Sequence, residues 1–599
     1  MLPGARRVAS SAARRNSSHV TPSGVRAPWQ DKGMERSGGS SGRDRLKPEK
    51  RMLLRLKVSR PQALKFDVGR KQMEWLPNLA VSNACIRVNE GLLPTRVAVV
   101  KKKRNLHHHQ ERQEREHKER AEAAAGVPVV KPLGGVGRRR CCDIMCLRLG
   151  ATHVIVVACP QIVCEVLRTK DEVFASRPTT FASGLFSFGY KGSIFSPQGE
   201  QWKKMRRVLT VQILASSMEG KLHHLRKEEY DHLVRYINKT LSSDMACPIN
   251  IVNIRHVTQH YVGNMIRRLV FGKRYFSDLP ASSASWPGHD EVAHVAALFT
   301  VLNHLYIFCM SDYFPTLIGL DLDGHEKVSK DAMQTINRLH DPIIEERIRE
   351  RSSTLEKFGE KKEARDFLDV LVHLKDAEGQ PMLSLEEIRA QTAEMMFAAV
   401  DNPSNAVEWA LAEMMNMPEI MQKATEELDA VVGKDRLVQE SDIPQLNYLK
   451  SCIREAFRLH PYHALNAPHV AMADTTIAGY TIPKDSHILL SWLGLGRNPK
   501  IWTEPLEFQP ERHLNTVNVL LIDPGLRFIS FSSGRRGCPG ISLGTSMTMM
   551  LFARMLQGFT WTKLPGVKSI SLQERNAGVA LAEPLVLQAT PRLAAHLYI

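Results

Sequence analysis

The chain has 599 residues, a formal net charge of +18 and ten cysteines at irregular spacings. These spacings exclude a disulfide framework, so the protein is expected to face a reducing compartment. The positive charge is unevenly distributed, because residues 1–142 hold 32 Lys and Arg against 12 Asp and Glu, whereas the rest of the chain holds 49 against 51.

Residues 1–142 are predicted to be a basic, largely disordered extension, because a segment so rich in charge cannot bury a core. They contain no uninterrupted run of 18 apolar residues, so no membrane anchor is predicted there. The basic runs are more consistent with a solvated tail than with a nucleic-acid site, and no nucleic-acid partner is expected. We interpret the segment as an unrelated or wrongly joined extension.

Residues 143–599 are predicted to form one large domain that is mainly α with a small β region. Ser384 and Glu387 form a capping box that begins a long helix. A nearly apolar stretch at 295–310 is expected to be a packed helix rather than a membrane span. Strands are expected at 153–157 and 476–482, and helices at 384–417, 418–432, 445–459 and through Met547, Met550 and Leu551.

Two residue pairs at helical spacing are candidates for a site. Trp202 and Arg206 stand four residues apart, so an indole N–H and a guanidinium can reach one acceptor. Glu455 and Arg458 stand three apart and can pair on one helical face. Arg512, in a Pro-Glu-Arg-His segment, is a second candidate partner for the Glu455 carboxylate. Each motif alone is also compatible with an ordinary surface or core helix.

The most informative segment runs from Phe531 to Gly540 and surrounds one cysteine, Cys538, with glycine, arginine and aromatic residues. A thiolate that ligates iron needs such surroundings. The glycines Gly534 and Gly540 let backbone N–H groups turn toward the sulfur and spread its charge. Arg536 offers a cation to an anionic group beside the metal, and Phe531 shields the sulfur from water.

In this order, the four motifs resemble those of the cytochromes P-450. The resemblance implies that fold, with haem b buried between a long distal helix and the cysteine loop, and Cys538 as the thiolate ligand. It places Arg536, Trp202 and Arg206, together with His469, toward the haem propionates. It also implies a buried charge network of Glu455, Arg458 and Arg512, which stabilises only when complete.

The oxygen side of the site departs from most of that family. Where an acid and a threonine usually relay protons, this chain has Asp401 and Asn402, followed by Pro403. Asparagine cannot deliver a proton as a hydroxyl does, so water or the substrate must take that place, and proline should kink the helix there. Phe186, Phe188, Tyr190, Tyr462, His463, Leu465 and Asn466 stand where the family has substrate-contacting loops.

The segment from Asp401 to Leu411 resembles the plant amino-acid N-hydroxylases, the aldoxime-forming cytochromes P-450. This resemblance implies that an L-amino acid, with tyrosine or another aromatic preferred, is N-hydroxylated to its aldoxime with O2 and NADPH. Cyanogenic glucoside and related defence pathways use such products. The partners implied are NADPH–cytochrome P-450 reductase and a membrane surface, and the location is the cytosolic face of the endoplasmic reticulum.

Two other interpretations stay open. A haem-thiolate isomerase or dehydratase that needs no reductase would also lack the distal threonine, although its ligand loop would usually depart from the standard pattern. Compared with that family, the catalytic domain at 143–599 is expected to lack its usual first elements. Alternatively, the protein is a non-functional product of a wrongly joined N-terminus. The requirement for NADPH and the spectrum of the reduced carbon-monoxide complex distinguish these cases.

Overall fold

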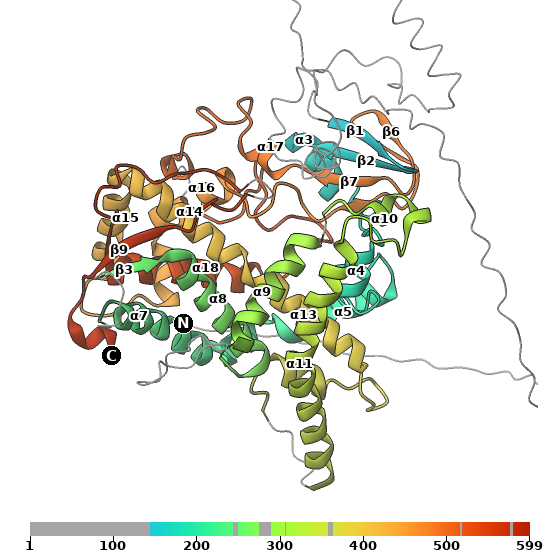
Figure 1. Ribbon diagram of the computed structural model, residues 1–599, viewed down its shortest axis with the longest axis horizontal. Helices are drawn as coiled ribbons and strands as arrows, with labels where there is room; N and C mark the ends of the chain where they lie inside the picture. The colour runs from blue at the N-terminus through green and yellow to red at the C-terminus, as the bar shows by residue number, and fades with distance from the viewer. Residues whose placement is uncertain are drawn as a thin grey trace, which may run out of the picture. The chain divides into compact units, whose positions relative to one another are not determined.

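The computed structural model describes residues 144–599, with gaps at 243–249, 275–288, 306, 358–362, 515–517 and 576–578 (Figure 1). The extension predicted for residues 1–142 and its boundary at residue 143 lie outside the described residues. Within the described ranges, no helix is both long and apolar enough to cross a membrane.

Helices make up most of the described chain, so the prediction of a mainly α domain with a small β region is confirmed. The helices are α3 Pro160–Cys164, α4 Phe181–Phe186, α5 Glu200–Arg207, α6 Ser216–Lys221, α7 His223–Ser242, α8 Ile254–Phe271, α9 His289–His304, α10 Met310–Tyr313, α11 His325–Lys357, α12 Phe367–His373, α13 Leu385–Val400, α14 Asn402–Asn416, α15 Pro418–Val431, α16 Asn447–Leu459, α17 Trp492–Gly496 and α18 Ile541–Gly558. Short 3-10 turns include η6, Pro510–His513.

Two small sheets lie on opposite sides of the helical body (Figure 1). One has the strand order β1-β2-β7-β4, in which β2 and β7 are parallel and the other pairs are antiparallel. The other is antiparallel, with the order β3-β9-β8. The strands are β1 Ile144–Leu149, β2 Thr152–Val157, β3 Ile251–Asn253, β4 His469–Val470, β5 Thr475–Ile477, β6 Tyr480–Ile482, β7 His487–Leu490, β8 Phe559–Thr562 and β9 Val586–Pro591.

One predicted strand is wrong. Residues 476–482 are not a single strand but fall within a hairpin of β5 and β6, which pair with each other. The chain reverses at Ala478 and Gly479, whose φ angles are 49° and 84°. Two consecutive positive φ angles are the geometry of a tight hairpin turn, and alanine gives no sequence signal for it.

The predicted long helix at 384–417 is present but interrupted. Its capping box is confirmed, because the Ser384 side chain accepts the Glu387 N–H while the Glu387 carboxylate accepts the Ser384 N–H at 2.8 Å. The helix stops at Val400, and α14 begins at Asn402 with Pro403 in its first turn. Proline has no N–H to continue the ladder, so the expected kink is a break at Asp401.

The core centres on α14, which is buried along almost its whole length and contacts α8, α16 and α18. The break before α14 therefore lies at the start of a buried helix, and Asp401 and Asn402 keep intermediate solvent accessibility. The loop that carries Cys538 leads directly into α18, on another face of the same core.

Candidate active site

The cysteine loop is a tight hairpin held by its own backbone. The Cys538 N–H donates to the Phe531 carbonyl at 2.8 Å, and the Gly537 N–H donates to the Gly534 carbonyl at 2.9 Å. Gly534 has a φ of 72°, and a Cβ there would lie 2.0 Å from the carbonyl oxygen of Leu167. Only glycine is therefore compatible with the loop at this position.

The sulfur of Cys538 lies among groups that favour an anion. The backbone N–H of Gly540 hydrogen-bonds the sulfur, and the charge of Arg206 acts on it as well. Burial is the larger effect and raises the pKa of the thiol above its ordinary value, while these two groups lower it. Arg206 is held in place because it donates to the Gly537 carbonyl at 2.6 Å.

Trp202 and Arg206 lie on α5 as predicted, and Arg536 joins them from the loop. The Arg536 guanidinium lies 4.3 Å from the centre of the Trp202 ring and donates to the Ser196 carbonyl at 2.7 Å. The indole Nε1 of Trp202 is buried and has no hydrogen-bond partner among the described residues. A buried N–H of this kind needs an acceptor, and the cations around it favour an anionic one.

His469 lies near this cluster but is not a cation. Its Nδ1–H donates to the Phe174 carbonyl at 2.7 Å. Burial, and then the charges of Arg177 and Arg536, hold the pKa of His469 well below its ordinary value. Arg177 supplies the positive charge instead, donating to the carbonyls of Ala467 at 2.8 Å and Pro468 at 2.9 Å.

Arg177 has no assigned role in the sequence predictions. Its charge reaches Arg206 and His469, so it belongs to the same cluster. Nothing in the local pattern around residue 177 indicates this, because its neighbours come from segments about 290 residues later.

These residues fit a haem whose iron takes a sulfur ligand. Cys538 offers a thiol whose sulfur receives an amide hydrogen bond, and the buried N–H of Trp202 lacks an acceptor that a propionate would supply. The cations Arg177, Arg206 and Arg536 suit the two negative charges of the propionates.

Glu455 is the buried centre of a charge network. Arg458 binds both carboxylate oxygens, at 2.7 and 2.8 Å, and Arg512 donates to one of them at 2.9 Å. Neither Glu455 nor Arg458 has an exposed side chain. Although burial raises the pKa of Glu455, its partners outweigh burial and lower the pKa to about 2. Glu455 is therefore ionised at neutral pH.

His513 is an additional member of this network that the sequence predictions missed. It stands where the family usually has an aromatic residue, and its Nε2–H donates to Oε2 of Glu455 at 2.7 Å. Its ring also packs edge-on against Trp502 and Phe528. Histidine thus keeps the aromatic packing and gives the carboxylate one more partner.

Asp401, at the break between α13 and α14, is desolvated. Burial raises the pKa of its carboxyl to about 6; Glu408 acts in the same direction, and Arg575 and Arg255 act against it. A carboxyl that titrates near neutrality can both take up and release a proton at working pH. The neighbouring Asn402 makes only a long contact of 3.4 Å from its Nδ2 to the Ala398 carbonyl.

Four residues of the expected substrate loops separate into two groups. Phe186 is fully buried and packs edge-on against Phe397 of α13, with 6.3 Å between the ring centres. The side chain of Asn466 has a structural role, because its Oδ1 accepts the N–H of Leu490 at 2.6 Å and so joins the loop after α16 to β7.

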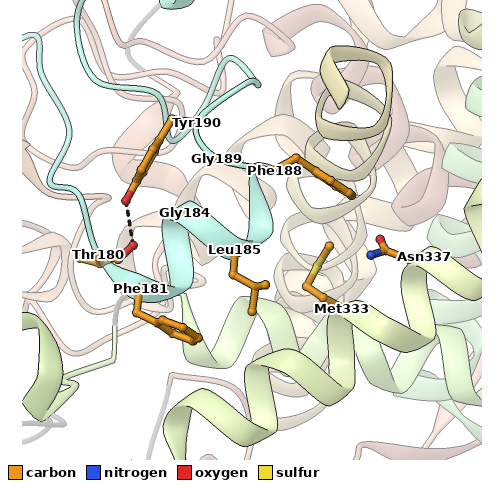
Figure 2. A pocket seen from close by; sticks show the side chains of 9 residues that line it. All are labelled: Thr180, Phe181, Gly184, Leu185, Phe188, Gly189, Tyr190, Met333 and Asn337. Carbon is orange, nitrogen blue, oxygen red and sulfur yellow. Dashed lines mark hydrogen bonds between the residues drawn. The ribbon is translucent and has the colours of Figure 1, made fainter. Parts of the chain in front are cut away.

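Phe188 and Tyr190 instead line a cavity of about 470 Å³ between α4 and α11 (Figure 2). Figure 2 shows Phe188 pointing toward Met333 and Asn337, while the Tyr190 hydroxyl donates to the Thr180 carbonyl at 2.9 Å. The cavity is thus built from the outer face of α4, whereas Phe186 extends from that helix toward α13.

Comparison with known proteins gives consistent matches. The family model described as cytochrome P-450 matches residues 138–588. Tyrosine N-monooxygenase of Sorghum bicolor is 57% identical over 462 residues, which cover 76% of this chain and 81% of the relative. Tryptophan N-monooxygenase 1 of Arabidopsis thaliana is 48% identical over 473 residues, covering 79% and 85%.

Among solved structures, a zebra fish cytochrome P-450 determined with progesterone has a TM-score of 0.61 at 24% identity. The match covers 75% of this chain and 96% of that one, and it shows the fold alone.

Proposed function

We infer that this chain, which belongs to the cytochrome P-450 family, is a monooxygenase that hydroxylates the α-amino nitrogen of an L-amino acid. The observation that carries this inference is the 57% identity with tyrosine N-monooxygenase. The geometry supports it, because an intact cysteine loop is combined with a distal helix that has Asp401 and Asn402 where most of the family has an acid and a threonine.

The residues of the site would have separate roles in haem binding and proton transfer. Bound haem supplies the oxygen-activating redox chemistry. Cys538 would hold it through sulfur, and the Gly540 amide would stabilise the thiolate. Trp202 and the three arginines of its cluster would bind the propionates, while Asp401 takes up and releases protons at its carboxyl.

The finer proposal concerns substrate, product and partners. We propose that tyrosine or another aromatic amino acid is hydroxylated twice on nitrogen, with two O2 and two NADPH, and that dehydration and decarboxylation then give the aldoxime. Electrons would come from NADPH through NADPH–cytochrome P-450 reductase. The enzyme would work at the cytosolic face of the endoplasmic reticulum.

The test is a panel of amino acids incubated with membranes that carry the protein and a plant reductase, followed by an aldoxime assay. We expect aldoxime from at least one aromatic amino acid, only when NADPH is present. Cys538→Ser should lose both the red-shifted Soret band of the reduced carbon-monoxide complex and the product. Cys146→Ser, at an exposed cysteine, is the matched control and should keep both.

A reductase-independent isomerase or dehydratase is the second candidate, because Asn402 takes the place of the usual threonine. Turnover without NADPH would favour it. The intact cysteine loop, with its amide hydrogen bond to the sulfur, supports oxygen chemistry instead.

A further inference from the structure

The cavity between α4 and α11 lies apart from the residues that would hold the haem. It is lined by residues of the segment 180–190 and of α11, and none of them belongs to the cysteine loop, the Glu455 network or the break at Asp401. Phe186, also on α4, is instead buried against Phe397 of α13. The helix α4 therefore presents one face to the distal helix and another to this cavity (Figure 2).

The turn that follows α4 has a strained backbone. Phe188, Gly189 and Tyr190 have φ angles of 53°, 74° and 64°. A left-handed backbone is uncommon for residues with large side chains, and strain of this kind is concentrated at active sites and ligand sites. Phe188 and Tyr190 both line the cavity. The strained turn thus brings two aromatic side chains to the same space.

Hydrogen bonds and close packing fix this turn. The Gly189 N–H donates to the Gly184 carbonyl at 2.8 Å, and the Tyr190 N–H donates to the Ser187 hydroxyl at 2.9 Å. The Tyr190 ring lies so close to Gly184 that an added Cβ there would be 3.0 Å from the phenol oxygen. The Tyr190 O–H is itself bound to the Thr180 carbonyl. This wall of the cavity is therefore preformed, and a ligand does not have to order it.

The walls are mostly apolar and aromatic. Phe181, Leu185 and Phe188 line the cavity from one segment, and Met333 lines it from α11 (Figure 2). Aromatic rings and a thioether sulfur make favourable contacts with an aromatic ligand. The volume of about 470 Å³ falls within the range of roughly 300–1,000 Å³ that is usual for small-molecule pockets.

Among the described residues that line the cavity, none has a charged side chain. Lys330 lies at its edge, 5.2 Å from the centre of the Phe181 ring, but is paired with Glu326 at 3.2 Å. The Asp312 carboxylate accepts the Phe181 N–H at 2.8 Å. An ammonium or carboxylate group that entered would lose its hydration without gaining a counter-charge from the walls. An amino acid carries both groups and is therefore disfavoured.

One polar side chain is open to a ligand. Asn337 of α11 lines the cavity and is only partly buried, and within the described part of the chain its amide makes no hydrogen bond to protein. An amide can both donate and accept a hydrogen bond. An oxime complements it, because the oxime O–H donates and the oxime nitrogen accepts.

We propose that the cavity between α4 and α11 is a second binding site, separate from the haem side, for an uncharged aromatic molecule with one small hydrogen-bonding group, such as an aromatic aldoxime. The inference rests on the function proposed above, in which an aromatic amino acid exchanges its ammonium and carboxylate groups for a neutral oxime. Substrate and product share the aromatic ring and differ in charge. The cavity distinguishes them on that basis and takes the product.

Equilibrium dialysis of the haem-loaded full chain, without NADPH, tests the proposal. The two probes are phenylacetaldoxime and L-phenylalanine, which have the same ring and differ in charge. The haem absorption spectrum is recorded at each concentration, because it responds to a molecule on the haem side and not to one in the cavity. The dialysis counts both.

Three variants are compared with the wild type. Leu185→Trp fills the cavity, and Asn337→Leu removes the amide while keeping a side chain of similar size. Gln334→Leu makes the same change at an exposed position of α11 that does not line the cavity, and it is the matched control. Haem content and melting temperature show which variants fold. If Leu185→Trp loses its haem, Asn337→Leu decides the outcome, because Asn337 is partly exposed.

We expect the wild type to bind one more mole of phenylacetaldoxime than of L-phenylalanine per mole of protein. Leu185→Trp should lose this additional mole, while the response of its haem spectrum to the aldoxime stays within twofold of the wild type. Asn337→Leu should weaken the additional binding at least fivefold, and Gln334→Leu should match the wild type.

Equal amounts of the two probes bound to the wild type, or an additional mole that persists in both cavity variants, overturn the proposal. A loss in Leu185→Trp that is matched by a loss of the haem response also overturns it, because the aldoxime would then lie on the haem side. The proposed function is judged separately. A wild type that binds the additional aldoxime but forms none from any amino acid, with NADPH and reductase present, would support the site and overturn that function.

Discussion

The two glycines on either side of Cys538 differ in what a methyl group would meet. At Gly534, φ is positive and an added Cβ would lie 2.0 Å from the Leu167 carbonyl oxygen. At Gly540, φ is −95° and the nearest atoms would be 3.9 Å away, an ordinary contact. A side chain is therefore excluded at the first position and tolerated at the second.

We expect Gly534→Ala to lose most haem, because alanine at positive φ costs roughly 1–2 kcal/mol even before the clash is counted. Gly540→Ala should retain at least half of the wild-type haem content. The height of the reduced carbon-monoxide band per mole of protein measures both. Equal loss in the two variants would mean that Gly540 serves the haem rather than the backbone.

At the residue scale, the sequence predicted groups whose partners are defined by a short motif. Glu455 and Arg458 stand three residues apart, and the residues that surround Cys538 lie within about ten residues of one another. Each arrangement can therefore be recognised from a short segment. Arg177 and His513 differ, because each meets partners from a distant segment that only the folded chain brings together. No local pattern could have assigned their contacts.

At the scale of elements, one carboxylate joins the distal helix to the loop before α5. Glu394 of α13 accepts the backbone N–H groups of Ser193 at 2.6 Å and Ile194 at 2.8 Å. Gly192 comes so close to the carboxylate that an added Cβ would overlap it. The carboxyl is completely buried, and burial raises its pKa to about 7, against the effect of those N–H groups.

This shift makes the stability of the fold depend on pH. An ordinary glutamate titrates near 4.5, whereas Glu394 does so near 7, so the folded protein binds more protons between these values. The stability that Glu394 contributes is fully present below pH 4.5 and is lost as pH rises through 7. From the size of the shift, the change is up to about 3 kcal/mol.

Glu394→Gln should remove this dependence, because the amide keeps an acceptor oxygen for the loop but does not titrate. We expect the melting temperature of the wild type to fall more steeply than that of the variant between pH 5 and pH 8. Glu419→Gln, at an exposed position on α15, is the control. Parallel curves for wild type and Glu394→Gln would contradict the assigned pKa.

Element prediction succeeded where a signal marks the end of an element and failed where the signal is absent. The capping box at Ser384 and the proline at 403 both mark helix ends, and the structure has helix ends at or next to them. The hairpin at 475–482 turns on Ala478, which adopts a conformation that alanine rarely takes. β-branched residues on both sides of the turn therefore read as one strand.

At the scale of the whole molecule, every residue assigned to the candidate site lies between Phe174 and Gly540. The charge of the chain is separated from this part, since residues 1–142 carry a balance of +20 and the remainder a balance of −2. The two segments should therefore contribute different properties. Residues 143–599 would bind the haem. The basic segment, residues 1–142, would provide a salt-dependent attraction to anionic surfaces.

A chain that begins at Asp143 tests this division. We expect it to bind haem to within twofold of the full chain, with the same red-shifted band of the reduced carbon-monoxide complex, because the ligand loop and the Glu455 network lie wholly within it. Its adsorption to anionic lipid vesicles at low salt should be weaker, as measured by co-sedimentation. A shortened chain without haem, beside a full chain that binds it, would show that the basic segment contributes to the fold.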